Sequence, residues 1–154
     1  MKETTLCFIV RDGKVLLGMK KRGFGSGKWN GFGGKLAEGE DPKRGVAREI
    51  AEEAGIAVDP AHLRDAGSLT FTFKDNPSWD NHCHLFAAED WTGEPGESDE
   101  MRPAWHSIRD LPFEQMWADD PHWVPLVLAG KRVEGRFFFD ESGDELINFA
   151  VSAK

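Results

Sequence analysis

The chain has 154 residues, with 19 lysines and arginines against 27 aspartates and glutamates, so its formal net charge is −8. This acidic balance excludes the basic face that a protein needs to bind duplex nucleic acid. A small polyanion such as a nucleotide remains possible where a divalent cation bridges the like charges. At this length, with 40% hydrophobic residues, we expect one domain over residues 1–154 with a sizeable core.

Cysteine content and hydropathy restrict the setting in which the chain works. Only Cys7 and Cys83 occur, and their spacing indicates neither a zinc site nor a disulfide scaffold, so we expect two reduced thiols. No apolar run approaches the roughly 20 residues that span a bilayer, and the first residues lack the apolar stretch of a secretory signal. We therefore expect a soluble, cytoplasmic monomer with no membrane partner.

The first third of the chain predicts a hairpin, a packed loop and a helix. Thr5–Val10 and Val15–Met19 are β-prone runs joined by Asp-Gly, a strong hairpin signal. Arg22–Lys35 contains six glycines and predicts a loop and short strand whose backbone approaches something closely. The helix Pro42–Ala54 has Asp41 as N-cap and ends at Gly55, and its expected apolar face is Val46, Ala47, Ile50, Ala51 and Ala54.

The remaining elements complete an α/β pattern. We expect strands at Ser68–Phe73, His82–Ala88 and Arg102–His106, a second helix over Pro112–Leu128 entered through Asp119-Asp120-Pro121, and a last hairpin of Gly135–Asp140 and Glu145–Val151. This order of elements predicts a mixed β-sheet with helices packed on its faces.

The polar side of the helix Pro42–Ala54 is unusually acidic. Glu49, Glu52 and Glu53 are spaced i, i+3 and i+4, so we expect all three to project from one face, opposite Ile50. Like charges at this spacing destabilise a helix. A solvated face partly compensated by nearby basic residues is the simpler explanation. A row of carboxylates beside a glycine-rich loop is also a plausible cradle for Mg²⁺ holding a diphosphate.

The same residues match a family pattern. Gly34, Glu40, Arg48, Glu49, Ile50, Glu52, Glu53, Gly55 and Ile56 fit G-x5-E-x7-R-E-U-x-E-E-x-G-U, where U is aliphatic, at every position. The chain therefore resembles the Nudix hydrolase family. The resemblance implies an αβα sandwich with a mixed sheet between helices. It also implies Mg²⁺-dependent cleavage, with Mn²⁺ possible, of a nucleoside diphosphate linked to another moiety.

The likeness extends beyond this box to the MutT-like branch of the family, from Leu6 to about Leu128. It rests on the segments Gly18–Gly25, Lys28–Lys35, Glu97–Pro103 and Met116–Asp120. It implies pyrophosphohydrolysis of oxidised purine nucleoside triphosphates, such as 8-oxo-dGTP and 2-hydroxy-dATP, which sanitises the nucleotide pool. The implied metal ligands are Glu49, Glu52, Glu53 and Glu100. The implied nucleotide contacts are Thr5, Lys20, Asn30, Phe32, Gly33, Gly34, Lys35, Phe71, Trp117, Asp119 and Asp120.

Physical roles can be assigned to several of these residues. Glu53, with Glu100 as its rival, is the candidate that orients or deprotonates the attacking water. Arg48 is expected to pair with a neighbouring carboxylate and fix the loop, because its guanidinium matches a carboxylate in a bidentate way. Two roles are open for Asn30: its side chain could donate a hydrogen bond to the base, or it could stabilise the glycine-rich loop.

Among the nucleotide contacts that the resemblance implies, Trp117, Asp119 and Asp120 are the candidates for recognising the base. Trp117 offers a flat face for stacking, which tolerates any base. Two nearby carboxyl groups in a dry pocket share a proton, and such a pair can meet both oxidised guanine and oxidised adenine edges. The competing interpretation is that this Asp-Asp pair only caps the helix before Pro121.

Several features leave the substrate open. The chain departs from the MutT-like pattern that it resembles: the segment Asn76–Asn81 carries Trp79 where that pattern has aliphatic side chains, and Thr4 stands where it has an aromatic. Another Nudix substrate, such as ADP-ribose or a dinucleoside polyphosphate, is therefore an alternative, and a non-catalytic nucleotide-binding module is a third. His82 and His84 alternate on a predicted strand, but no third metal ligand accompanies them in sequence, so we expect no metal role for them.

Overall fold

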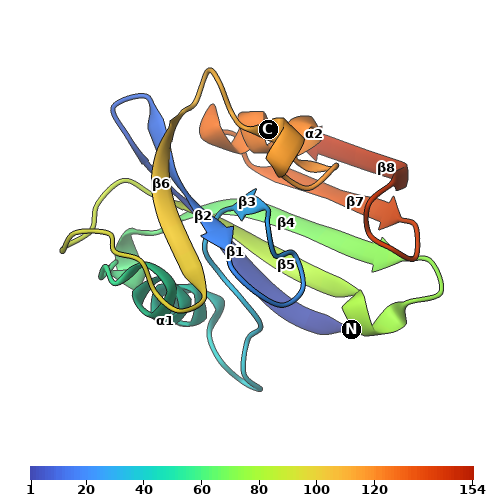
Figure 1. Cartoon of the computed structure of the whole chain (residues 1–154), viewed down its shortest axis with the longest axis horizontal. Coiled ribbons are helices and arrows are strands. Elements are labelled where there is room, and N and C mark those ends of the chain that lie inside the picture. Colours follow the sequence, from blue (N-terminus) through green and yellow to red (C-terminus); the bar gives the residue numbers. More distant parts are fainter.

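The computed structural model describes all residues, 1–154, as a mixed β-sheet with two α-helices (Figure 1). Its strands are β1 (Lys2–Arg11), β2 (Lys14–Lys20), β3 (Trp29–Asn30), β4 (Arg64–Phe73), β5 (Asn81–Ala88), β6 (Met101–Ser107), β7 (Val133–Phe139) and β8 (Leu146–Ala153). Its helices are α1 (Pro42–Ala54) and α2 (Asp120–Leu128), with single 3₁₀ turns at Pro60–His62, Pro77–Trp79 and Phe113–Gln115.

The sheet brings distant parts of the chain side by side. Its order is β3-β2-β1-β5-β4-β7-β8, with β6 paired to β2. The β1–β5 and β4–β7 pairs are parallel, and the other pairs are antiparallel. Both predicted hairpins, β1–β2 and β7–β8, are confirmed. The parallel β1–β5 pair joins the start of the chain to its middle, which no local sequence signal could indicate.

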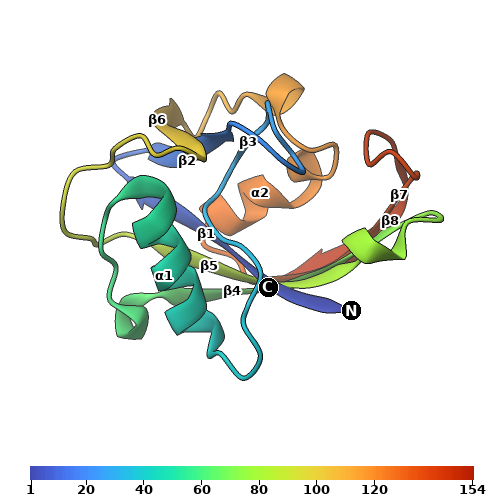
Figure 2. The same ribbon diagram turned by 60° about the horizontal axis from the view of Figure 1, so that its bottom comes forward.

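The helices pack on opposite faces of the sheet, so the predicted α/β class is confirmed. Alternate residues of a strand point to opposite faces. On β1, Cys7 and Ile9 pack in one buried cluster with Ile50 of α1, whereas Phe8 packs in another with Trp123 of α2. Figure 2 shows the two helices as separate layers with the strands running between them.

The predicted helix α1 is confirmed, but its faces differ from the prediction. Asp41 caps it by accepting a hydrogen bond from the Arg44 N–H at 3.2 Å, and Gly55 ends it at φ 72°. The glutamates do not share one exposed face: Glu52 is exposed, Glu49 is half-buried and Glu53 is only 9% exposed. Glu53 lies three residues after buried Ile50, about 60° around the helix, so it enters the boundary of the core. Ala51, placed on the apolar face, is exposed instead.

The second predicted helix was too long. The segment before Asp120 contains only the 3₁₀ turn Phe113–Gln115, and α2 begins at Asp120. The reason is local chemistry: the Asp120 side chain accepts the Trp117 N–H at 3.2 Å, an interaction that holds a turn and starts a new helix. The boundary matters because it places Trp117, Asp119 and Asp120 around one bend.

Two further predictions concern the cysteines and the membrane. Cys7 and Cys83 are both buried free thiols, as expected. Neither helix is long and apolar enough to cross a bilayer.

Candidate active site

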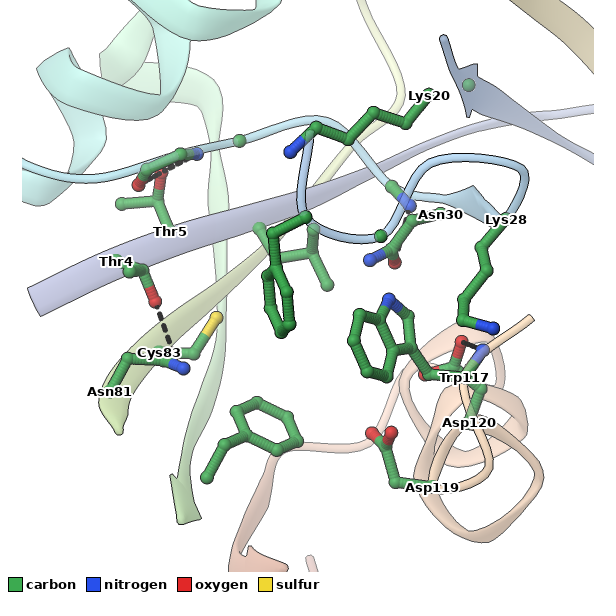
Figure 3. Close-up of a pocket in the computed structure, with 18 of the residues that line it drawn as sticks. Thr4, Thr5, Lys20, Lys28, Asn30, Asn81, Cys83, Trp117, Asp119 and Asp120 are labelled. Atoms are coloured by element: carbon green, nitrogen blue, oxygen red, sulfur yellow. Dashed lines mark hydrogen bonds between the residues drawn. The ribbon is translucent and has the colours of Figure 1, made fainter. Parts of the chain in front are cut away.

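A cavity of about 240 Å³ lies between the sheet, the glycine-rich loop and the start of α2. Its walls come from several parts of the chain: β1, β2, the glycine-rich loop with β3, α1, the β4–β5 hairpin, β6, the bend before α2 with α2 itself, and β7. Figure 3 shows Asn30, Trp117 and Asp119 pointing into it from different elements. Glu53 of α1 lines the same cavity. The same cavity therefore has aromatic walls that suit an organic ring and also contains a carboxylate of the acidic helix α1.

Asp119 and Asp120 form a buried carboxyl pair at one end of the cavity, 3% and 2% exposed. Asp119 occupies the N-cap position of α2 but makes no capping hydrogen bond. Its Oδ2 instead accepts the Trp123 Nε1–H at 2.6 Å. This contact disfavours the interpretation of Asp119 as a simple helix cap, because the side chain turns away from the helix N–H groups.

Burial sets the protonation of this pair. Desolvation raises the pKa of Asp119, and the Trp123 indole opposes that shift. Desolvation and the charge of Asp119 together raise the pKa of Asp120 well above its usual range. Two carboxyl groups so close in a dry site cannot both ionise cheaply. Asp120 therefore holds a proton that it can donate, beside Asp119 as an acceptor.

Aromatic side chains build the apolar wall of the cavity. The ring of Trp117 lies 5.0 Å from that of Phe24 and 6.0 Å from that of Phe139, centroid to centroid. Lys28 Nζ lies 5.4 Å from the Trp117 ring centroid. Asn30 lines the cavity while its Oδ1 accepts the Gly31 N–H at 2.8 Å. That bond stabilises the loop and leaves the amide NH₂ of Asn30 free to donate, so both of its predicted readings fit the geometry.

Glu53 is a buried carboxylate with one fixed hydrogen-bond donor, the Gly33 N–H at 3.0 Å from its Oε1. Desolvation, helped by the charges of Glu49 and Glu100 and opposed by the Gly33 hydrogen bond and by Lys20, raises the pKa of Glu53 to about 8. Burial also raises the pKa of Glu49, with smaller contributions from the charges of Glu52 and Glu100, while Arg48 opposes the shift. The distal Glu100 thus acts electrostatically on both helix residues.

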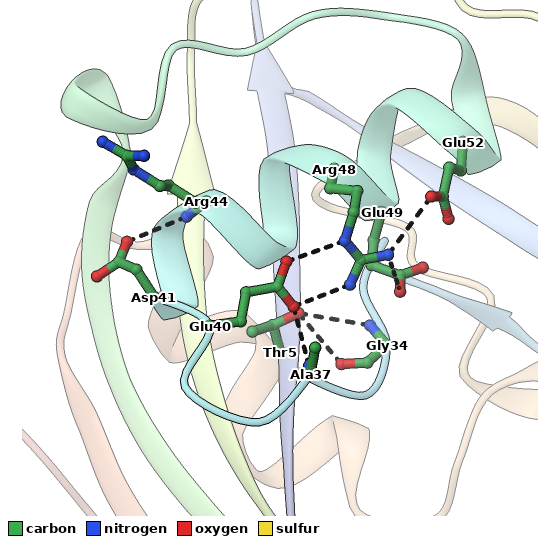
Figure 4. Close-up of polar contacts among 9 residues, drawn as sticks. All are labelled: Thr5, Gly34, Ala37, Glu40, Asp41, Arg44, Arg48, Glu49 and Glu52. Atoms are coloured by element: carbon green, nitrogen blue, oxygen red, sulfur yellow. Dashed lines mark hydrogen bonds and ion pairs between the residues drawn. The ribbon is translucent and has the colours of Figure 1, made fainter.

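Arg48 ties the glutamates of α1 to the preceding loop (Figure 4). Its Nε and Nη2 each donate to the Glu40 carboxylate at 3.0 Å, a bidentate pair, and Nη1 donates to Glu49 at 3.0 Å and Glu52 at 3.4 Å. Hydrogen bonds from Arg48 lower the pKa of Glu40 to about 2. The predicted role of Arg48 as a partner for carboxylates is confirmed.

The cavity gathers most of the residues predicted to contact a nucleotide: Thr5, Lys20, Asn30, Gly33, Gly34, Phe71, Trp117, Asp119 and Asp120. Two others lie elsewhere. For these two the prediction concerns the backbone of Phe32–Lys35, of which Gly33 and Gly34 line the cavity; the Phe32 side chain is buried in the cluster against α1, and Lys35 lines a separate groove. Several lining residues were not anticipated, among them Phe24, Lys28, Phe73, Asn81, Cys83 and Phe139. The predicted strand Gly135–Asp140 contained Phe139 but did not indicate that it would line a cavity. In the structure Phe139 is the register partner of Phe73, which lines the same cavity.

Gly33 has a backbone fit that predicts a large effect of substitution. A Cβ there would overlap the Thr5 carbonyl oxygen of β1. We expect Gly33→Ala to lower the free energy of unfolding by about 2–3 kcal/mol, measured by urea denaturation, because the clash is with backbone. Gly96→Ala is the matched control, since nothing lies within 4 Å of a Cβ at that position. Equal stability of the two variants would contradict the close approach.

The prediction that no third ligand accompanies His82 and His84 holds for the local sequence but not for the fold. His82 and His84 do have a third partner: Glu3 Oε1 lies 3.0 Å from His82 Nδ1 and 2.9 Å from His84 Nε2. The partner comes from β1, where Glu3 is the register neighbour of His82 on β5. A partner supplied by a parallel strand almost 80 residues away is invisible to local spacing.

Comparison with known proteins agrees with this geometry. Residues 1–127 match the NUDIX domain. The chain is 51% identical over 138 residues to the oxidized purine nucleoside triphosphate hydrolase of Danio rerio, covering 90% of this chain and 86% of that one. It is 43% identical over 147 residues to the protein of the same name from Mus musculus, covering 96% and 92%. The crystal structure of a MutT protein from Bacillus halodurans superposes with a TM-score of 0.82 at 26% identity, covering 99% of this chain and 98% of that one. The chain belongs to the Nudix family of hydrolases.

Proposed function

We propose that this chain is a Mg²⁺-dependent pyrophosphohydrolase that converts oxidised purine nucleoside triphosphates, such as 8-oxo-dGTP and 2-hydroxy-dATP, to the monophosphate and pyrophosphate. The observation that carries the proposal is the shared cavity: the buried Asp119–Asp120 pair lies at the base end, and Glu53 of the acidic helix lines the same space. The relatives from Danio rerio and Mus musculus, named for this activity, support the substrate class.

The acidic residues of α1 suit a hard divalent cation. Nudix hydrolases generally need a divalent metal, and Mg²⁺ prefers oxygen ligands from few carboxylates and from substrate phosphates. Buried carboxylates are normally paired or bound to metal, and Glu53 has only one N–H donor. A Cβ on Gly34 would come within 2.8 Å of the Glu49 carboxylate, so glycine keeps this space open. Glu49, Glu52, Glu53 and Glu100 are the proposed ligands.

The chain's own residues divide the work of hydrolysis. Bound Mg²⁺ would neutralise phosphate charge and make water a better nucleophile. Glu53 lines the cavity and is buried, whereas Glu100 is exposed, so we assign to Glu53 the orientation of the attacking water and the acceptance of its proton. Arg48 holds Glu49, Glu52 and the loop at Glu40 in register. Lys20, at the cavity wall, adds positive charge toward the phosphates.

The base is held by complementary hydrogen bonds and stacking. Protonated Asp120 supplies a donor and Asp119 an acceptor, while Asn30 adds an amide on the opposite wall. The Trp117 ring offers a stacking face. A pair of carboxyls that can exchange its proton fits both oxidised guanine and oxidised adenine.

The remaining expectations belong to the same proposal. We infer that residues 1–154 act as one Nudix domain, as a cytoplasmic monomer that binds no duplex nucleic acid. The net charge of −8 supports the last point, because phosphate backbones repel such a surface.

A turnover panel tests the proposal. With Mg²⁺ present, we expect kcat/KM for 8-oxo-dGTP and 2-hydroxy-dATP to exceed that for dGTP and dATP by at least about tenfold, because hydrogen-bonded sites discriminate strongly. Chelation of the metal should abolish turnover. Faster hydrolysis of ADP-ribose or a dinucleoside polyphosphate would assign the chain to another Nudix substrate, and tight binding without turnover would assign it to a non-catalytic module.

A further inference from the structure

The parallel pairing of β1 with β5 assembles three metal-binding side chains outside the cavity. Glu3 is the register partner of His82, and His84 lies two residues further along β5, on the same face. Their ligand atoms all lie within 4.8 Å of one another. None of the three lines the cavity that holds Asp119 and Glu53.

We propose that Glu3, His82 and His84 form a second metal site, selective for Zn²⁺ and distinct from the acidic helix. Two imidazoles and one carboxylate are a ligand set that zinc favours, with water in a fourth position. Magnesium avoids imidazole and prefers oxygen. The chemistry of this trio therefore differs from that of Glu49, Glu52 and Glu53.

The spacing of the trio is compatible with coordination. Zinc bonds of about 2.0–2.1 Å in a tetrahedral arrangement place ligand atoms roughly 3.3 Å apart. Glu3 Oε1 lies 3.0 Å from His82 Nδ1 and 2.9 Å from His84 Nε2, close to this spacing, and the two imidazole nitrogens lie within 4.8 Å of each other. The two rings stand at 70°, with centroids 4.8 Å apart, and so converge on one carboxylate rather than stacking.

The surroundings leave room for a fourth ligand. The side chains of Glu3, His82 and His84 are 48%, 34% and 27% exposed. Glu3 and His84 line a surface groove that also carries Lys35 and Glu40 from the loop before α1. Water can therefore reach the metal from the groove. Bound metal would link the beginning of the chain to the middle of the sheet.

Zinc titration of the metal-free protein, followed by calorimetry, tests the site. Because carboxylates are also zinc ligands, the comparison is between variants that share the acidic helix α1. We expect the unmodified protein to bind one more equivalent of Zn²⁺ than the double variant His82→Gln/His84→Gln. We expect Glu3→Gln to weaken this equivalent by at least about tenfold, because even outer-shell changes cost that much. His62→Gln is the matched control, since His62 also lies near a carboxylate, Asp59, but at 3.8 Å and without a third ligand.

Nuclear magnetic resonance of the imidazole nitrogens gives a readout that needs no variant. Zn²⁺ should shift Nδ1 of His82 and Nε2 of His84 and leave His62, His106 and His122 unchanged. Mg²⁺-dependent nucleotide hydrolysis should be the same in Glu3→Gln and in the unmodified protein, so failure of this proposal is distinguishable from failure of the proposed activity. Equal zinc stoichiometry in all proteins, or unshifted nitrogens of His82 and His84, would overturn the site.

Discussion

Replacement of Glu53 by glutamine should abolish most turnover while the protein stays folded. Glutamine keeps the oxygen that accepts the Gly33 N–H but can neither carry charge nor take a proton. We expect kcat for 8-oxo-dGTP to fall by about 10²–10⁴-fold, the range associated with loss of a general base or a metal-bound carboxylate. Steady-state kinetics in saturating Mg²⁺ measures the effect.

The same substitution should stabilise the metal-free protein. Glu53 is a buried carboxylate beside Glu49 and Glu100, and burial raises its pKa to about 8. At neutral pH the native state must protonate a group that the unfolded chain leaves ionised, and a neutral isostere removes that cost. We expect the Tm without metal to rise by roughly 2–6 °C, seen by calorimetry. A gain in stability with a loss of activity is typical of a catalytic residue, because functional sites retain groups that folding disfavours.

Glu94→Gln is the control for both measurements, because Glu94 is exposed and lies outside the cavity. It should leave kcat and Tm unchanged. Turnover of Glu53→Gln at the rate of the unmodified protein would show that another group, with Glu100 the first candidate, handles the water.

Local chemistry in the sequence was enough to predict much of the fold. The Asp-Gly turn gave the β1–β2 hairpin, and Asp41, Pro42 and Gly55 gave both ends of α1, because each residue acts on its own neighbours. The spacing of Arg48 from its glutamates gave their pairing for the same reason. Such signals are contained within one turn of the backbone.

What the sequence could not predict depends on contacts between distant segments. The burial of Glu53, at the edge of the apolar face of α1, depends on the contacts of that edge with β1 and with the loop at Gly33, which the sequence of α1 alone does not specify. Asn81 and Cys83 reach the cavity because β5 runs beside β1, and Glu3 reaches His82 for the same reason. The length of α2 was misjudged because one side-chain bond from Trp117 to Asp120 outweighs helix propensity.

The Asp119–Asp120 pair should determine which bases are accepted. Asp119→Asn replaces a hydrogen-bond acceptor by an amide, next to the donor Asp120. The amide N–H group would then face a donor of the base, and both groups would be buried without a partner. We expect kcat/KM for oxidised purine nucleotides to fall by about 10²-fold or more, because unpaired buried groups are costly. Asp120→Asn supplies a permanent donor at this position. This variant should therefore keep its activity toward one oxidised purine nucleotide and lose its activity toward the other. Asp110→Asn, exposed and outside the cavity, is the control.

The pair also predicts two pH effects, one on stability and one on activity, and both are losses as pH rises. Its native pKa values are raised, so above the unfolded value of 3.8 the native state holds protons that the unfolded chain has released. Stability therefore falls as pH rises through the window between 3.8 and the native pKa values, and Asp120→Asn should flatten this slope.

Activity should respond through the donor. Ionisation of Asp120 at high pH removes its proton, so kcat/KM for the substrate that needs that donor should decline there, and this decline should be absent in Asp120→Asn. Profiles of kcat/KM against pH for 8-oxo-dGTP and 2-hydroxy-dATP measure it. Identical profiles in the variant and the unmodified protein would mean that the proton shared by these two carboxyls takes no part in reading the base.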